Sequence, residues 1–198
     1  MSYQKEQDQI LAALSGTPRL LLHSCCGPCS SYCLEVLSAY FFVTVLWYNP
    51  NIAPREEYFL RLEHQKKLIE NLNTVHPVTL MTADYAPEEY YAAVKGLERE
   101  PEGGARCTVC FAQRLELTAR TAKEKGFDFF TTTLKVSPHK NADVINAIGQ
   151  EMAKRYQVAF LPSDFKKKNG YQRSIALSRQ YSLYRQNYCG CKFSQRQI

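Results

Sequence analysis

Short apolar runs alternate with amphipathic segments along most of this 198-residue chain. The run FFVTVLWYN (41–49) is rich in β-branched and aromatic residues, which is typical of a buried strand. The next segment, 54–73, begins at a proline and repeats apolar residues on one helical face. Strands that alternate with helices predict a mostly parallel sheet with helices on both faces. With 45% hydrophobic residues, the chain is expected to form a single α/β domain over residues 1–198.

The remaining elements follow from the same patterns. Further strands are predicted at 19–24, 75–85, 127–134 and 158–162. Further helices are predicted at 30–40, 87–98, 108–125, 143–156 and 169–188, with Asn169 capping the last one. In an open α/β sheet, ligands bind where loops leave the carboxyl ends of the strands, so functional residues are expected there.

Seven of the eight cysteines fall in three closely spaced groups. They are the first cysteine group (Cys25, Cys26 and Cys29), the second cysteine group (Cys107 and Cys110) and the C-terminal cysteine pair (Cys189 and Cys191). Thiols at such spacings, gathered by a fold, build metal or iron–sulfur sites. A disulfide framework belongs instead to small secreted domains that lack a core. A chain of this length needs no such staples, so a metal or cluster is predicted.

The three groups differ in what they can do. The first follows the strand at 19–24 and the second straddles the start of the helix at 108–125, and a helix N-terminus stabilises an anionic centre. The one-residue spacer of the C-terminal pair makes chelation of one metal awkward, so this pair is predicted to be redox-active and able to form a strained disulfide. Cys33 is predicted to be a buried structural thiol. A closed structural zinc site is the alternative for four of the thiols.

Two other side chains are candidates for proton transfer. His23 directly precedes the first cysteine group, and it is either a proton donor or a satisfied histidine at a strand end. Asp164 follows the last predicted strand, and it is either a ligand or proton donor or the cap of the next helix. His139, just beyond another strand, is a candidate for the substrate side of the site.

Basic residues are concentrated at the C-terminus. Residues 165–198 hold eight Lys and Arg and no Asp or Glu, with tyrosines interleaved. Cations bind phosphates and aromatic rings stack on unpaired bases, so this basic segment is predicted to pack on the domain and to contact single-stranded or looped RNA. A solvated basic helix with core tyrosines is the alternative. The predicted RNA contacts are Lys166, Lys167, Lys168, Tyr171, Arg173 and Arg185.

The chain carries no pattern expected of a membrane protein. No stretch approaches the roughly 20 apolar residues of a membrane span. The N-terminal residues 1–19 contain acidic side chains and do not read as a signal peptide. A cytoplasmic location, where thiols stay reduced, is therefore expected.

Several motifs together resemble a known family. They are LLHSCCGPCS, YNPNIAPREEY, EPEGGARCTVCFAQRL, TTTLKVSPHKN, DFKKKNGYQRS and YRQNYCGCKFS, and they run from about Leu21 almost to the C-terminus. This set resembles the cobalamin-independent epoxyqueuosine reductases of the QueH type. The resemblance implies a Rossmann-like fold of the nucleotide-binding α-hydrolase group and reduction of epoxyqueuosine to queuosine in tRNA. It also implies a [4Fe–4S] cluster, a nearby second iron and electrons from a ferredoxin- or flavodoxin-like donor.

The resemblance also assigns individual thiols. Cys25, Cys26, Cys107 and Cys110 correspond to cluster ligands, and Cys29 stands where a ligand of the additional iron would come from. Cys189 and Cys191 correspond to a terminal redox pair. Two other functions remain open: a zinc- or cluster-stabilised RNA-binding module, and a tRNA sulfur-transfer enzyme, although the latter predicts a phosphate-binding loop after the first strand and none is present.

Overall fold

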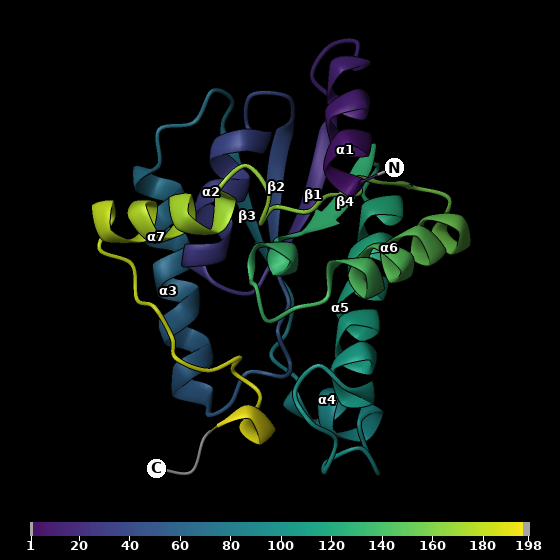
Figure 1. The fold of residues 1–198 in the computed structure, drawn as a ribbon, viewed down its shortest axis with the longest axis vertical. Coiled ribbons are helices and arrows are strands. Elements are labelled where there is room, and N and C mark those ends of the chain that lie inside the picture. The colour runs from purple at the N-terminus through teal and green to yellow at the C-terminus, as the bar shows by residue number, and fades with distance from the viewer. Residues whose placement is uncertain (1, 196–198) are drawn as a thin grey trace.

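The computed structural model describes residues 2–195, and its centre is a sheet of five parallel strands with helices on both faces (Figure 1). The strands are β1 (Arg19–Ser24), β2 (Phe42–Trp47), β3 (Val78–Thr82), β4 (Phe129–Thr132) and β5 (Ala159–Phe160), in the spatial order β3-β2-β1-β4-β5. The helices are α1 (Tyr3–Ala12), α2 (Gly27–Leu37), α3 (Arg55–Asn71), α4 (Pro87–Ala93), α5 (Ala105–Glu124), α6 (Ala142–Tyr156) and α7 (Gly170–Gln180), with 3-10 turns η1 (Thr133–Val136) and η2 (Lys192–Ser194). The predicted α/β class is confirmed, and the strand order is compatible with a Rossmann-like fold.

Strand β1 lies at the middle of the sheet and pairs in parallel with both β2 and β4. Its residues Leu20, Leu21 and Leu22 are fully buried, as expected of a strand covered on both faces. Leu21 packs in the core on the side of α5 and α6. Leu20 and Leu22 pack in the core on the opposite side, against α1, α2, α3 and the segment around α7. The alternation along β1 thus contributes to two cores, one on each face of the sheet.

The structure adds one helix and corrects several predictions. Helix α1 was not predicted from the sequence. Helix α5 begins at Ala105, so the second cysteine group lies inside its first two turns rather than across its start. Helix α4 ends at Ala93, short of the predicted 98. Asn169 occupies the N-cap of α7, but its side chain makes no capping hydrogen bond.

The last predicted helix is also too long, since α7 ends at Gln180 rather than near residue 188. Ser182 has a φ of 49°, in the left-handed region, and Leu183 N–H donates to the Ser178 carbonyl, a bond that closes a helix C-terminus. Residues 181–191 then run without regular structure along α3, and we call them the C-terminal strap (Figure 1). Within residues 2–195, no helix is both long and apolar enough to cross a membrane.

Gly149 in α6 tests how tightly the core is packed. A Cβ at this position would overlap the ring of Phe160 in β5, and that ring packs at a tilt against Phe130, with 5.1 Å between the centroids. Alanine normally stabilises a helix interior over glycine by about 1 kcal/mol. Here we expect Gly149→Ala to lower the free energy of unfolding, measured with urea, by about 1–3 kcal/mol because the site is overpacked. The exposed neighbour change Gln150→Ala should stay within about 0.5 kcal/mol. A G149A protein as stable as the unchanged one would contradict this.

A candidate thiol site at the carboxyl edge of the sheet

After β1 the chain continues toward one edge of the sheet, and after β4 it continues toward the other edge. This divergence opens a crevice at the carboxyl ends of the two strands. A cleft of about 240 Å³ lies there. Residues after β1 and after β4 form two of its walls, and the C-terminal strap forms a third. Its lining includes Cys25, Cys29, Ser137, His139, Lys140, Tyr171, Arg185, Gln186, Tyr188 and Cys189. Two of the three cysteine groups therefore meet in one cleft.

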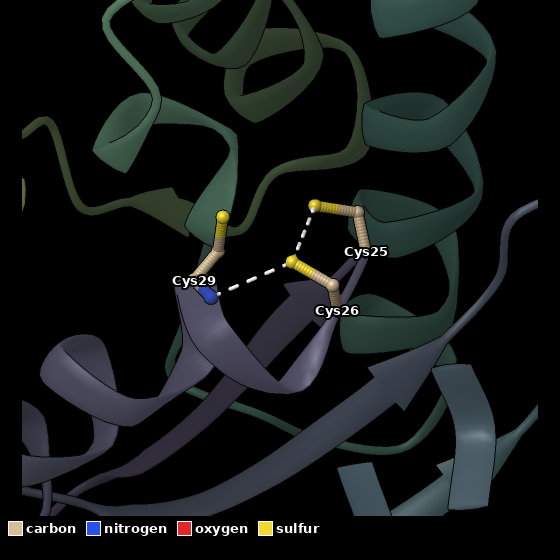
Figure 2. A group of neighbouring side chains, drawn as sticks. All are labelled: Cys25, Cys26 and Cys29. Carbon is tan, nitrogen blue, oxygen red and sulfur yellow. Dashed lines mark hydrogen bonds between the residues drawn. The ribbon is translucent and has the colours of Figure 1, made fainter. Parts of the chain in front are cut away.

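The first cysteine group forms a compact cluster of sulfurs, as Figure 2 shows. The three Sγ atoms all lie within 4.8 Å of one another, and those of Cys25 and Cys26 are 3.9 Å apart. Cys26 is the N-cap of α2, and its Sγ accepts a hydrogen bond of 3.4 Å from the backbone N–H of Cys29. A thiol thus stands where helices usually carry Ser or Asp. This donor set can hold a metal ion.

Close packing against α3 fixes the loop that carries these thiols. A Cβ on Gly27 would lie 2.9 Å from the backbone oxygen of His64, so only glycine lets the loop approach α3 this closely. Ser24 and Ser30 both donate to the buried Oε1 of Gln65, at 2.7 Å each. These contacts hold the two ends of the loop, so the thiol positions do not depend on a bound ligand alone.

Hydrogen bonds and nearby cations give the thiols of the first cysteine group different pKa values. Hydrogen bonds from Cys26 and Cys29, helped by the charges of Lys140 and Arg114, hold the pKa of Cys25 well below its usual value. Donation to Cys25 raises the pKa of Cys26 to about 12. Without a metal, negative charge therefore concentrates on Cys25.

The second cysteine group approaches the site from α5. Cys107 Sγ accepts a 3.2 Å hydrogen bond from the backbone N–H of Gly103. Cys110 is buried, and burial raises the pKa of its thiol to about 12. Both line a small inner cavity together with Cys189 and Cys191. Since Cys189 also lines the cleft, it connects the two sets of thiols.

The C-terminal cysteine pair is held by α3. Arg61, buried in α3, donates to the carbonyl oxygen of Cys189 at 3.1 Å and to that of Tyr188 at 3.3 Å, and its Nε is paired with Glu57 at 2.7 Å. Gly190 has a φ of 106°, and a Cβ there would lie 2.9 Å from Nη1 of Arg61. The turn between the two cysteines therefore needs glycine and this arginine together.

The thiols of the pair have separate surroundings. Cys191 is buried, and its Sγ lies 3.0 Å from the hydroxyl of Tyr90 in α4. All eight cysteines are free in residues 2–195, so the predicted disulfide is not formed in this structure. Cys33 is fully buried in the core between α2 and the sheet, where a structural thiol was predicted.

The two predicted proton donors lie outside the lining of the cleft. His23 is fully buried; its Nδ1 lies 2.9 Å from Thr132 Oγ1 and its Nε2 lies 3.1 Å from the Tyr48 carbonyl oxygen. Burial lowers the pKa of His23 to about 3. Asp164 accepts a hydrogen bond from the backbone N–H of Lys166 and forms an ion pair with its Nζ. These contacts favour the structural alternative for His23, whereas Asp164 does not cap the next helix, because the N-cap of α7 is Asn169.

The predicted RNA contacts divide into two sets. Lys168 is paired with Asp8 at 2.8 Å and Arg173 with Glu35 at 2.5 Å, so helices α1 and α2 neutralise part of the basic segment. Lys166 is likewise paired with Asp164, while Lys167 is exposed. Tyr171 and Arg185, in contrast, line the cleft. Another cation of the basic segment, Arg196, lies outside the described residues.

Four residues at the site were not predicted from the sequence: Arg61, Tyr90, Arg114 and Lys140. Only Arg114 carried a local signal, because it lies one helical turn after Cys110 on the same face. Arg61 and Tyr90 reach their cysteines from helices more than one hundred residues away in the chain. Such long-range contacts leave no mark in the spacing of residues.

Comparisons with known proteins agree with the motifs. Residues 20–197 match the family model described as Epoxyqueuosine reductase QueH. Proteins named Epoxyqueuosine reductase QueH are 48% identical in Streptococcus pyogenes (89% of this chain and 70% of that protein) and 43% identical in Staphylococcus aureus (96% and 84%). The protein of that name in Thermotoga maritima is 37% identical over 88% of this chain and 89% of its own length.

Cys29 and Cys33 form a matched pair for testing the metal site. Both lie in α2, four residues apart, but only Cys29 belongs to the sulfur cluster. We expect Cys29→Ala to bind less iron per chain after anaerobic reconstitution with iron and sulfide, because a soft ligand is removed. Cys33→Ala should retain the iron. Iron and acid-labile sulfide per chain are measured, and unchanged iron in C29A would show that Cys29 is not a ligand.

Proposed function

Since the chain belongs to the epoxyqueuosine reductase QueH family, we propose that it reduces epoxyqueuosine at the tRNA wobble position to queuosine, the last step of that modification. Overall, the epoxide takes up two electrons and two protons; both C–O bonds break, an alkene forms and the oxygen leaves as water. The catalyst therefore needs an electron path, a place for the modified base and a source of protons.

One observation carries the proposal. Cys25, Cys29 and Cys189 line the same cleft as Tyr171, Tyr188 and Arg185. Aromatic rings are the surfaces on which unpaired bases stack, and cations bind the phosphates that flank them. A base drawn out of the anticodon loop can enter this cleft and come to rest beside the thiols. Redox-competent sulfur and base-binding side chains thus share one opening.

The residues of the site fit an iron–sulfur cluster. Thiolates are the ligands that iron–sulfur clusters require, and a four-thiolate cluster carries net negative charge. The buried guanidinium of Arg114 and the half-buried ammonium of Lys140 face the thiols and complement that charge. Cys25, Cys26, Cys107 and Cys110 are proposed to hold a [4Fe–4S] cluster, with Cys29 beside it for an additional iron.

When bound, the metal centre would supply electrons one at a time from a ferredoxin- or flavodoxin-like donor, and an open iron position would supply a Lewis acid for the epoxide oxygen. The protein side chains supply the rest. Tyr171 and Tyr188 orient the base at the cleft, and Arg185 holds the adjacent backbone. His139 and Lys140, at the cleft wall after β4, are better placed than His23 or Asp164 to deliver protons to the leaving oxygen.

The C-terminal cysteine pair is proposed to act as a dithiol. Cys189 lines both the cleft and the inner cavity, next to the second cysteine group. Oxidation of Cys189 and Cys191 to a disulfide would release two electrons and two protons, which equals the demand of one epoxide reduction. The ion pair of Arg61 and Glu57 keeps the turn at this place.

Loss of the gene tests the function directly. In a host without another epoxyqueuosine reductase, we expect deletion to leave epoxyqueuosine in tRNA and no queuosine, as measured by mass spectrometry of tRNA nucleosides. The unchanged gene should restore queuosine, and the Cys25→Ala gene should not, since a ligand to the proposed cluster is lost. Normal queuosine in the deletion strain would refute the proposal and favour an RNA-binding module.

Arg185 and Lys168 test the RNA-binding surface. Arg185 lines the cleft, whereas Lys168 is paired with Asp8 on the side of α1. We expect Arg185→Ala to weaken tRNA binding and to reduce the slope of log Kd against log salt by about 1, because one phosphate contact is lost. Lys168→Ala should leave that slope unchanged. Equal slopes in the two variants would place the RNA elsewhere.

A further inference from the structure

Arg114 in α5 is a buried cation without an anionic partner in the protein. Its side chain is 1% exposed, and none of the ion pairs within residues 2–195 includes it. Its Nε donates to the Cys110 carbonyl one turn earlier, at 3.1 Å, while Nη2 has no hydrogen-bond partner among the described residues. A buried charge with an unpaired donor is costly, so it indicates an anion that joins the site.

The surroundings of Arg114 identify that anion. Arg114 lines the inner cavity together with Cys107, Cys110, Cys189 and Cys191. Burial alone would lower its pKa, but the charges that Cys110, Cys189 and Cys25 carry when they are ionised more than offset this effect and raise it. One guanidinium therefore faces members of all three cysteine groups. The exposed carboxylate of Glu102, which also lines the cavity, forms no ion pair with it.

We propose that Arg114 is the counter-charge of the metal–thiolate centre and thereby sets how tightly the thiols hold metal and how readily the centre is reduced. This proposal rests on the proposed thiolate-bound cluster. Ligation by three or more thiols replaces neutral S–H groups by thiolates, so the site becomes net negative even after a divalent ion binds. A fixed cation nearby stabilises that state, and it stabilises the reduced cluster, which carries one more negative charge, even more.

The proposal predicts opposite effects on the empty and the loaded protein. Without metal, Arg114→Met removes an uncompensated buried charge, so the stability of the metal-free, reduced protein in urea should stay the same or increase. With metal, the same change removes the counter-charge. We expect the Kd for Co²⁺, measured anaerobically by the absorbance of its thiolate complex, to rise by about 10- to 100-fold. The midpoint potential of the reconstituted iron–sulfur centre should become more negative.

Two further variants separate charge from packing. Arg114→Lys keeps the charge and should retain most of the Co²⁺ affinity. Arg120→Met removes an exposed cation from the same helix, away from the thiols, and should leave Co²⁺ binding unchanged. If R114M fails to fold, Arg114→Gln replaces it in the comparison with R114K. Unchanged Co²⁺ affinity and potential in the neutral variant would overturn the proposal, as would R114K binding as weakly as the neutral variant.

The measurement of Co²⁺ affinity does not depend on the proposed reduction of epoxyqueuosine. Co²⁺ binding is measured without tRNA, so a wild-type protein that binds Co²⁺ in an Arg114-dependent way but leaves epoxyqueuosine intact would refute the proposed function and support the role of Arg114. A protein that reduces epoxyqueuosine, with R114M matching it in Co²⁺ affinity and potential, would do the reverse.

Discussion

The cleft depends on one buried side chain that joins three strands at their carboxyl ends. His23 in β1 lies at hydrogen-bonding distance from Thr132 at the end of β4 and from the Tyr48 carbonyl just after β2. Thr132 Oγ1 also accepts from Leu134 N–H and so starts the turn η1. Because burial keeps the imidazole neutral, Nε2–H can donate to Tyr48 while Nδ1 accepts from Thr132. The first cysteine group and the opposite wall are thus both set from β1.

The C-terminal cysteine pair is positioned in a different way. No strand leads directly into Cys189, and the C-terminal strap has no regular structure of its own. Its backbone oxygens are instead bound by Arg61, and the Tyr184 hydroxyl donates to Glu57, so one ion pair on α3 serves both ends of the strap. A buried ion pair contributes little net stability, but loss of one partner leaves an uncompensated charge. This pair fixes position more than it adds stability.

The parts of the structure that follow from local sequence were predictable, and the parts that depend on distant contacts were not. The period of apolar residues predicted the parallel sheet, and the loop after β1 predicted where the first cysteine group lies. The end of α7 was missed because it depends on a left-handed Ser182, a conformation that serine rarely adopts. The basic segment was predicted to contact RNA, but the pairing of Lys168 with Asp8, 160 residues away in the chain, could not be predicted from its local sequence. Likewise, spacing alone does not reveal that Arg61 and Arg114 are buried.

Cations lie beside the thiols of the site, and they allow the two proposed ligands, an anionic cluster and RNA, to bind next to each other. An anionic cluster and an RNA backbone repel each other, and in a poorly solvated cleft that repulsion is weakly screened. Arg114 lies among the thiols, and Lys140 lines both the cleft and the neighbouring cavity beside Cys107. Arg185 also lines the cleft and is exposed to solvent. In the proposed complex, Arg185 and Lys140 attract the phosphates, so the base can lie beside the thiols while the repulsion of its backbone is reduced.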